Sequence, residues 1–188
     1  IGDIRSFNAD FSFYADVGPS NRLLNPKLAG GALLDIGIYP ISYACMLFSK
    51  NPSRVSSSME MGATGVDVQS AFLFEYENGA IAELTASFKQ AGSNGAVICG
   101  SKGQIHIPAF WKANQVTLNI SGQGGVTHRF PYPSSGLQFE AREVMDCIRE
   151  GRIESRVMAL AETRRTLRLM DTLRADWGLT YPCEKAEN

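Results

Sequence analysis

At 188 residues, the chain is long enough for one domain with a sizeable hydrophobic core, or at most for two small domains. Hydrophobic residues make up 44% of the sequence and charged residues 20%, which excludes a disordered chain. The formal net charge of -1 argues against the strongly basic surface of a nucleic-acid-binding protein.

Membrane and compartment signals are weak in this sequence. We find no apolar run of the roughly 18 residues that cross a bilayer, so we expect no membrane partner. The chain begins at Ile1 and Asp3 follows at once, which predicts no signal peptide and either a trimmed terminus or a piece of a longer protein. The scattered cysteines form no C-x-x-C pair, which predicts reduced thiols, a cytoplasmic protein and no metal site. These cysteines are Cys45, Cys99, Cys147 and Cys183.

The first predicted elements are a strand, a loop and a helix. Residues 4–14 predict the strand, and residues 15–27, with two X-Pro turns, predict the loop. The helix is expected from Gly30 to about Lys50, because its apolar residues recur by four and three along one face. Those residues are Leu34, Ile38, Ile41, Cys45 and Phe48.

Pro40 lies inside the predicted helix. It removes one backbone N–H donor, so we expect a kink or a new helix start just after Tyr39.

From Arg54 to about Phe130 the pattern changes to period two, which predicts a meandering, largely antiparallel sheet. The tripeptide Glu77-Asn78-Gly79 predicts a tight hairpin turn. Apolar side chains occur on both sides of one strand, with Phe72 and Phe74 opposed to Leu73, which predicts a sheet covered on both faces. The predicted strands are residues 68–76, 80–89, 96–99, 104–107, 116–120 and 126–130.

Two helices are predicted to close the chain. The first begins at Leu137 and stops at Gly151, and the second runs from about Met158 to Trp177. We detect no internal repeat and no linker, so residues 1–188 form one domain. The predicted fold class is α+β, with an open-faced, predominantly antiparallel sheet and helices packed on one face.

Asp35 and Tyr39 are the strongest candidates for chemistry. They lie four residues apart, which places them on the same face of a helix. A carboxylate that orients a hydroxyl, beside a phenol that moves a proton, makes half of a catalytic site. The phenol of a tyrosine ordinarily titrates near pH 10, so this chemistry needs a nearby cation. The alternative is structural, since an acid favours a helix N-terminus and tyrosine is common at the edge of a core.

Several other polar residues have a structural interpretation. Arg22, just before the helix, reaches either an anionic group or solvent, and we retain it as a candidate substrate-binding residue. His106 and His128 are predicted on strand surfaces. The basic side of the last helix is expected to face solvent. It consists of Arg164, Arg165 and Arg168.

The glycine clusters do not make a dinucleotide-binding loop. Such a loop needs G-x-G-x-x-G between a strand and a helix. Gly122-Gln123-Gly124 starts the pattern, but Thr127 takes the third position and a strand is predicted next.

Four ordered segments resemble a known family. Residues 30–41, GGALLDIGIYPI, look like the substrate-domain signature of the Gfo/Idh/MocA oxidoreductases, and residues 100–105, GSKGQI, match that family's G-[ST]-x-G-x-[IL] hairpin. Residues 1–6 and 137–141 resemble the family's strand after its interdomain helix and the start of its penultimate helix. The resemblance covers essentially the whole chain and is nearest to the branch that contains dimeric dihydrodiol and NADP-dependent xylose dehydrogenases.

The resemblance implies a two-domain enzyme of which only the second domain is present. The family's first domain is a Rossmann fold with a glycine fingerprint and a lysine in a Glu-Lys-Pro motif. Glu184-Lys185 is not this motif, because Ala186 follows. We therefore expect NAD or NADP in the full-length protein, no tight cofactor binding by this chain alone, and no activity of the chain alone.

The resemblance also implies roles for single residues. Tyr39 takes the catalytic position, and Asp35 takes that of the acid that contacts a substrate hydroxyl near the nicotinamide. The implied reaction moves a hydride between the cofactor and a sugar, polyol or trans-diol, while Tyr39 handles the hydroxyl proton. The family's mode of assembly implies a homodimer or higher oligomer through the sheet face. The alternative is a non-catalytic scaffold that uses the same fold for assembly.

Overall fold

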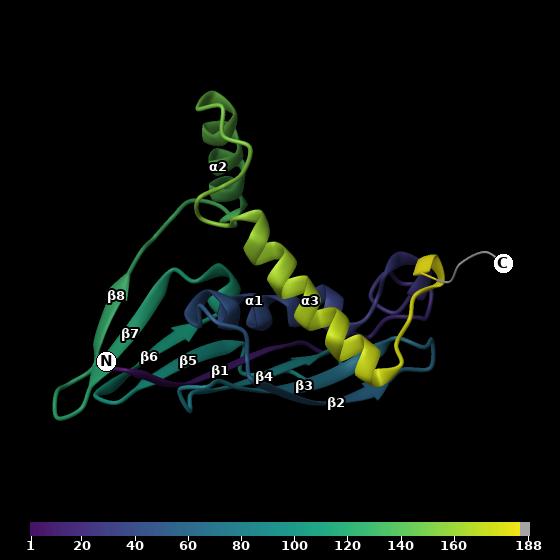
Figure 1. The fold of residues 1–188 in the computed structure, drawn as a ribbon, viewed down its shortest axis with the longest axis horizontal. Helices are drawn as coiled ribbons and strands as arrows, with labels where there is room; N and C mark the ends of the chain where they lie inside the picture. Colours follow the sequence, from purple (N-terminus) through teal and green to yellow (C-terminus); the bar gives the residue numbers. More distant parts are fainter. Residues whose placement is uncertain (185–188) are drawn as a thin grey trace.

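The computed structural model of the chain describes residues 1–184, in which eight strands form one sheet with helices above one face (Figure 1). The strand order is β2-β3-β4-β1-β5-β6-β7-β8, so the first strand of the chain lies inside the sheet. β1 and β4 are parallel, and the other neighbouring strands pair antiparallel. The strands are β1 (Ile4–Ser12), β2 (Arg54–Met61), β3 (Asp67–Glu75), β4 (Ile81–Ser87), β5 (Gly95–Gly100), β6 (Gly103–Pro108), β7 (Gln115–Ile120) and β8 (Val126–Arg129).

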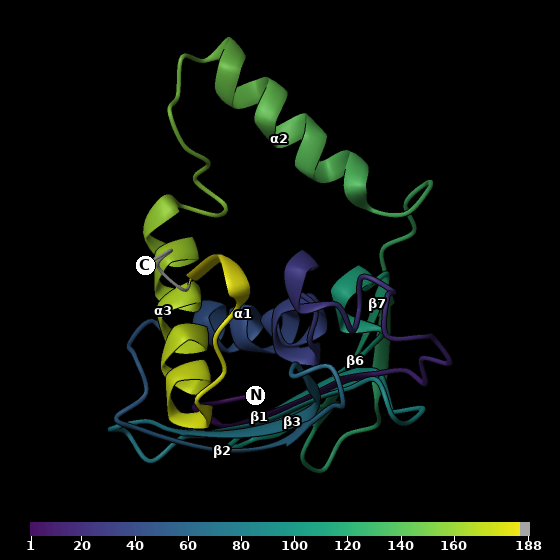
Figure 2. The same ribbon diagram turned by 90° about the vertical axis from the view of Figure 1, so that its right-hand side faces the viewer.

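The helices are gathered on one side of the sheet, as Figure 2 shows in edge view. This arrangement confirms the predicted α+β class and the predicted open-faced, mostly antiparallel sheet. The helical elements are η1 (Pro26–Leu28), the π-helical turn η2 (Leu33–Gly37), α1 (Ile38–Leu47), η3 (Phe110–Lys112), α2 (Leu137–Arg149), α3 (Leu160–Trp177) and η4 (Pro182–Glu184). The tail containing Lys185 and Ala186 lies outside the described residues.

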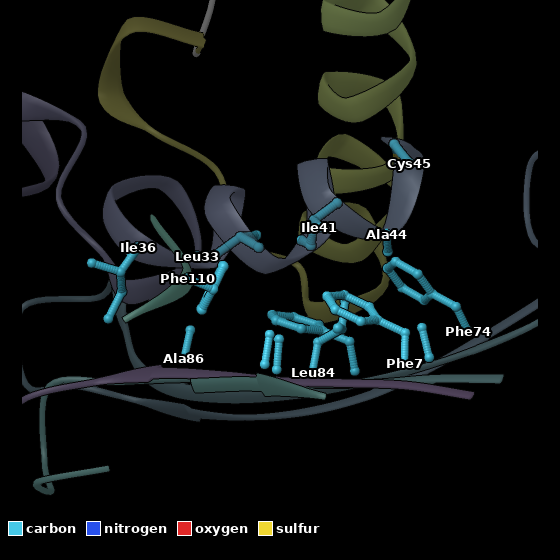
Figure 3. Close-up of a cluster of buried hydrophobic side chains, with 14 of the residues drawn as sticks. Phe7, Leu33, Ile36, Ile41, Ala44, Cys45, Phe74, Leu84, Ala86 and Phe110 are labelled. Carbon is cyan, nitrogen blue, oxygen red and sulfur yellow. The ribbon is translucent and has the colours of Figure 1, made fainter. Parts of the chain in front are cut away.

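The core lies between the sheet and the layer formed by η2 and α1. Side chains alternate along each strand, so every second residue faces this layer. Phe7, Phe74 and Leu84 from the strands lie below Leu33 and Ile41, all almost fully buried (Figure 3). Burial of such side chains stabilises the fold by roughly 1.5–3 kcal/mol each.

The opposite face of the sheet, called the polar sheet face below for its charged and amide side chains, also carries apolar residues such as Leu73 and Val97. Asn8, Glu83 and His106 line a shallow hollow of about 770 Å³ on this face. Leu73 also lines this hollow, while Phe72 and Phe74 are buried toward the helices. The alternation of these three residues is therefore confirmed, with Leu73 on the exposed face.

The helix that carries Asp35 and Tyr39 starts with a π-helical turn, which changes the predicted register. The predicted stripe included Leu34 and Ile38, but Leu33 and Ile36 are the buried residues in this turn. A π-helix places more residues in each turn than an α-helix, which shifts the phase of the buried face. No new helix starts after Tyr39, because the backbone stays helical from η2 into α1. Pro40 lies just beyond the π-helical turn, where the regular α-helical hydrogen-bond pattern is already interrupted.

One stretch of the described residues is long and apolar enough, by length and composition alone, to cross a membrane. It runs over Pro26–Leu47 and was overlooked in the sequence analysis, which found no such run; 56% of its apolar 18-residue window is buried inside the protein. Contact with the sheet accounts for its apolar character, as in the core helix of a globular domain.

The basic side of α3 differs from its prediction at one residue. Arg164 and Arg168 are exposed, but the side chain of Arg165 is only 15% exposed and turns toward α1. Its guanidinium donates to the carbonyl oxygens of Phe48 and Ser49 at 2.9 and 2.7 Å, and to that of Cys45. Arg165 therefore caps the end of α1 instead of facing solvent.

α2 stands apart from the sheet and from the other helices in both views (Figures 1 and 2). Its start at Leu137 and the turn at Gly151 agree with the prediction. The predicted apolar stripe of this helix is largely exposed, with Ile148 at 73%. The four cysteines are free thiols, as predicted.

Candidate active site

The junction of η2 and α1 presents both predicted site residues at the surface of the helix layer. Tyr39, on the first turn of α1, is 43% exposed. Asp35, inside the π-helical turn, has a side chain that is 21% exposed. Neither group is sealed in the core, so both are accessible to a small molecule.

Arg22 is directly paired with Asp35. The guanidinium Nη1 lies 2.5 Å from Oδ1 of the carboxylate, and the Arg22 side chain is 67% exposed. The hydrogen bond to Asp35, reinforced by the opposite charge, raises the pKa of Arg22 above its ordinary value. The sequence analysis kept two alternatives for Arg22, contact with an anionic group or with solvent. The structure shows contact with an anionic group, the carboxylate of Asp35.

Two aromatic residues from distant parts of the chain lie beside Tyr39. The ring of Phe11, near the end of β1, meets the Tyr39 ring edge to face at a centroid distance of 5.2 Å. Trp111, from η3, stacks on Phe11 at 4.1 Å with an interplanar angle of 12°. Such contacts hold aromatic rings in fixed orientations. The phenol of Tyr39 therefore stands next to a rigid, flat, apolar surface.

A groove of about 540 Å³ runs from Tyr39 along α1. Met46 and Tyr43 of α1, Trp111 of η3 and Met158 before α3 line it together with Tyr39. Burial raises the pKa of Tyr43, so this second phenol stays protonated at neutral pH. The groove is large enough for a ligand of the size of a sugar or cyclic diol.

Sequence reasoning missed Phe11 and Trp111. Phe11 occurs at a helix-facing position of the first strand, in phase with Phe7, and that phase was the available signal. Trp111 occurs between two predicted hairpins, and no motif marks it.

The other candidates lie elsewhere. His106 and His128 are exposed on strands, as predicted, and His106 lies on the polar sheet face. Gly122 and its neighbours form the turn between β7 and β8, so their backbone does not fit the pyrophosphate of a dinucleotide, which needs a loop that opens a helix. Within residues 1–184, no three His, Cys, Asp or Glu side chains are grouped as a metal site.

Comparison with known proteins identifies the family. Residues 1–106, more than half of the chain, match the family model of the GFO/IDH/MocA C-terminal domain. The fold agrees with this assignment. The chain belongs to the Gfo/Idh/MocA oxidoreductase family, as its sequence segments predicted.

The relatives are about twice as long as this chain. It is 31% identical over 196 residues to trans-1,2-dihydrobenzene-1,2-diol dehydrogenase of Mus musculus, and 32% identical over 194 residues to that of Xenopus laevis. These alignments cover 98% and 97% of this chain but 57% of each relative. The chain therefore spans little more than half the length of these dehydrogenases.

Solved structures share the fold. Aldose-aldose oxidoreductase from Caulobacter crescentus superposes with a TM-score of 0.79 at 23% identity, over 93% of this chain and 53% of that protein. The 3-ketoreductase KijD10 from Actinomadura kijaniata, in complex with NADP and TDP-benzene, gives 0.79 at 24% identity, over 93% of this chain and 54% of that protein. At this level of identity the likeness concerns the fold.

Proposed function

We propose that this chain is the C-terminal, substrate-binding domain of an NAD(P)-dependent oxidoreductase that acts on a CH–OH group of a sugar, polyol or diol. The observation that carries the proposal is the exposed phenol of Tyr39 at the end of an aromatic groove, four residues along the same helical segment from Asp35, which is paired with Arg22. The family and the diol dehydrogenase relatives support the substrate class.

In this proposal Tyr39 moves the proton. During reduction of a carbonyl, its hydroxyl donates a proton to the substrate oxygen as the new C–H bond forms. During oxidation, the phenolic oxygen takes the proton of the substrate hydroxyl as the C–H bond breaks. Positioned proton transfer of this kind contributes about 100-fold to 10,000-fold in rate.

Asp35 and the aromatic residues position the substrate. Arg22 occupies Oδ1 of Asp35 and fixes the carboxylate, which leaves Oδ2 to accept a hydrogen bond from a second substrate hydroxyl. Trp111, which stacks on Phe11 and lines the groove, offers a flat surface to the apolar face of a sugar or cyclic diol. A bound nicotinamide cofactor supplies the hydride acceptor or donor.

The cofactor is held by a separate N-terminal nucleotide-binding domain in this proposal. The glycine turn between β7 and β8 does not fit a pyrophosphate, which supports a cofactor site outside this chain. We expect NAD or NADP to bind weakly, if at all, to residues 1–188 alone. The exposed apolar side chains of α2, such as Ile148, give such a domain a surface to cover.

We further propose a homodimer, or a higher oligomer, that assembles through the polar sheet face, in a cytoplasmic protein. The hollow of about 770 Å³ on that face and the two-fold symmetry usual among homodimers support a second copy there. The free thiols agree with a reducing compartment.

The test uses the longer protein that carries both domains. Tyr39→Phe is expected to lower kcat by at least about 100-fold for sugars or diols with NAD or NADP, while thermal unfolding is unchanged. Tyr76→Phe is the matched control, because Tyr76 stacks on Phe48 at the other end of α1 and should keep full turnover.

Wild-type turnover of Tyr39→Phe would remove this residue from the mechanism. A wild-type protein that turns over none of these substrates would instead favour the scaffold alternative.

A further inference from the structure

Asp67, the first residue of β3, is a buried carboxyl group that the proposed mechanism does not use. Its side chain is fully buried, and its Oδ2 accepts hydrogen bonds from the backbone N–H of Leu33 at 2.7 Å and from the Ser70 hydroxyl at 3.4 Å. Its Oδ1 has no hydrogen-bond partner among the described residues. A carboxyl group held in this way is costly, so its retention needs a reason.

The contact of Asp67 with Leu33 lies at the start of the segment that carries the site. Leu33 is the first residue of η2, which contains Asp35 and leads without a break into α1 and Tyr39. The carboxyl group therefore holds the entry of this helix, where backbone N–H groups have no partner within the helix.

The preceding glycine permits this contact. Gly31 has φ +121, and a Cβ atom there would lie 2.5 Å from Oδ1 of Asp67. Only glycine adopts this backbone conformation and leaves room for the carboxyl group.

A second side chain contacts the same helix entry. The hydroxyl of Tyr181, from the C-terminal segment, donates a hydrogen bond of 2.6 Å to the carbonyl oxygen of Gly30. Strand β3 and the C-terminal segment thus both contact Gly30-Gly31, with Oδ1 of Asp67 and the hydroxyl of Tyr181 on the same side of Gly31. Both contacts lie at the start of η2.

We propose that Asp67 is a positioning residue of the candidate site, which sets the orientation of Asp35 and Tyr39 by holding the N–H of Leu33. The role as a positioning residue rests on the proposed function of Tyr39, but the hydrogen bond between Asp67 and Leu33 does not depend on that function. Asp67 touches neither the groove nor its aromatic surface, so it acts through the helix entry alone.

The charge of Asp67 gives the proposal a measurable signal. Burial raises its pKa from 3.8 to about 6, against the opposing effect of the hydrogen bonds from Leu33 and Ser70. Above that pH the carboxylate accepts a charge-assisted hydrogen bond from Leu33, and below it the group is protonated and the bond weakens.

Other titratable groups face Asp67 or its neighbours. Tyr181 interacts with the charge of Asp67, and its pKa is raised to about 12, chiefly by burial. Arg174 lies over the Tyr181 ring at 5.1 Å and pairs with Glu184. Hydrogen bonds from the Tyr181 backbone and from Arg174 lower the pKa of Glu184. Tyr181 therefore stays neutral and Glu184 stays ionised around pH 6.

Asp35 and Arg22 form their own ion pair, on η2 and just before it. Arginine side chains stay protonated throughout the range from pH 4.5 to pH 8. The carboxyl group of Asp67 is thus the group at this helix entry whose charge changes near pH 6.

The experiment follows backbone and ring resonances by NMR in the 188-residue protein from pH 4.5 to pH 8. The amide of Leu33 and the ring of Tyr39 are expected to shift with one common midpoint, near 6. Asp67→Asn should abolish both shifts. Asp176→Asn, on the exposed side of α3, makes the same chemical change and should leave them unaltered.

Ser70→Ala keeps the test decisive if Asp67→Asn does not fold. It removes one hydrogen bond that lowers the pKa of Asp67, so the midpoint should rise for Leu33 and Tyr39 together. The proposal would be overturned if the Leu33 amide shifts with pH and the Tyr39 ring does not. It would also be overturned if the Tyr39 shift persists in Asp67→Asn.

The NMR shifts of Leu33 and Tyr39 can be measured without any enzymatic turnover. Failure of the Tyr39→Phe activity test with an intact titration would therefore reject the proposed function and leave the link between Asp67 and Tyr39 in place. A Tyr39 ring that does not shift with pH, together with an inactive Tyr39→Phe variant, would support the proposed function and reject the link between Asp67 and Tyr39.

Discussion

Arg165 of α3 donates a hydrogen bond of 2.7 Å to the carbonyl oxygen of Ser49, two residues beyond the end of α1. The last carbonyl groups of a helix have no partner within it, and here a side chain from another helix supplies one. α3 thereby fixes the end of α1 that lies opposite Tyr39.

We expect Arg165→Met to lower the free energy of unfolding by about 2–3 kcal/mol, because several carbonyl groups lose a charged donor. Urea denaturation measures this loss. Arg164→Met, at an exposed neighbouring position, should change stability little. Equal losses in both variants would show that Arg165 is not a cap.

Gly31→Ala is expected to destabilise the fold by about 3 kcal/mol or more, because the new methyl group meets the held carboxyl group of Asp67 in a backbone conformation that alanine resists. Gly65→Ala is the matched control. Gly65 also has positive φ, at +86, but no atom lies within 4 Å of the position that its new methyl group would take, so about 1 kcal/mol of strain is expected. Thermal or urea unfolding of both variants separates strain from crowding, and similar losses would contradict the close contact of Asp67 with Gly31.

Asp67 should also impose a pH dependence on stability. Because burial raises its pKa from 3.8 to about 6, the folded protein binds this proton more tightly than the unfolded chain. The stabilisation that protonated Asp67 provides is complete below about pH 4 and is lost as pH rises through about 6.

A shift of about two pKa units corresponds to about 3 kcal/mol. The stability of wild type relative to Asp67→Asn should therefore fall by about this amount between pH 4 and pH 7, as measured by urea unfolding at each pH. Parallel profiles for the two proteins would contradict the raised pKa.

Thr85→Arg is expected to convert the proposed dimer into a monomer, because Thr85 lies on the polar face of the sheet and lines its hollow. Light scattering after gel filtration measures the mass, and circular dichroism checks the fold. Ala175→Arg, at an exposed position of α3 on the other side of the sheet, should leave the mass unchanged. A dimeric Thr85→Arg protein would move the interface elsewhere.

The local patterns of the sequence predicted most of the elements but not how they pair. Alternation placed one strand at residues 68–76, and the structure has β3 at Asp67–Glu75. The turn before β4 forms with Gly79 at φ +79, as Asn78-Gly79 predicted. The parallel pairing of β1 with β4 left no signal, because side-chain alternation reports which face is buried and not which strand lies alongside.

The same distinction applies to the candidate site. Asp35 and Tyr39 were found because they lie close together in one segment. Phe11 and Trp111 come to Tyr39 from β1 and η3, and Asp67 of β3 contacts the entry of the helix that carries Tyr39, so only the folded chain reveals these relationships. The π-helical turn was also missed, since its apolar residues fit an ordinary helix equally well.

The central place of β1 has a consequence for biosynthesis. A nascent chain that has emerged only to residue 60 holds its first strand without either neighbour, because β4 and β5 lie between residues 81 and 100. Such pairing between distant segments slows folding. Residues 4–12 therefore leave the ribosome well before β4 and β5 are available to pair with them. Chaperone binding to these residues during synthesis would protect them from aggregation.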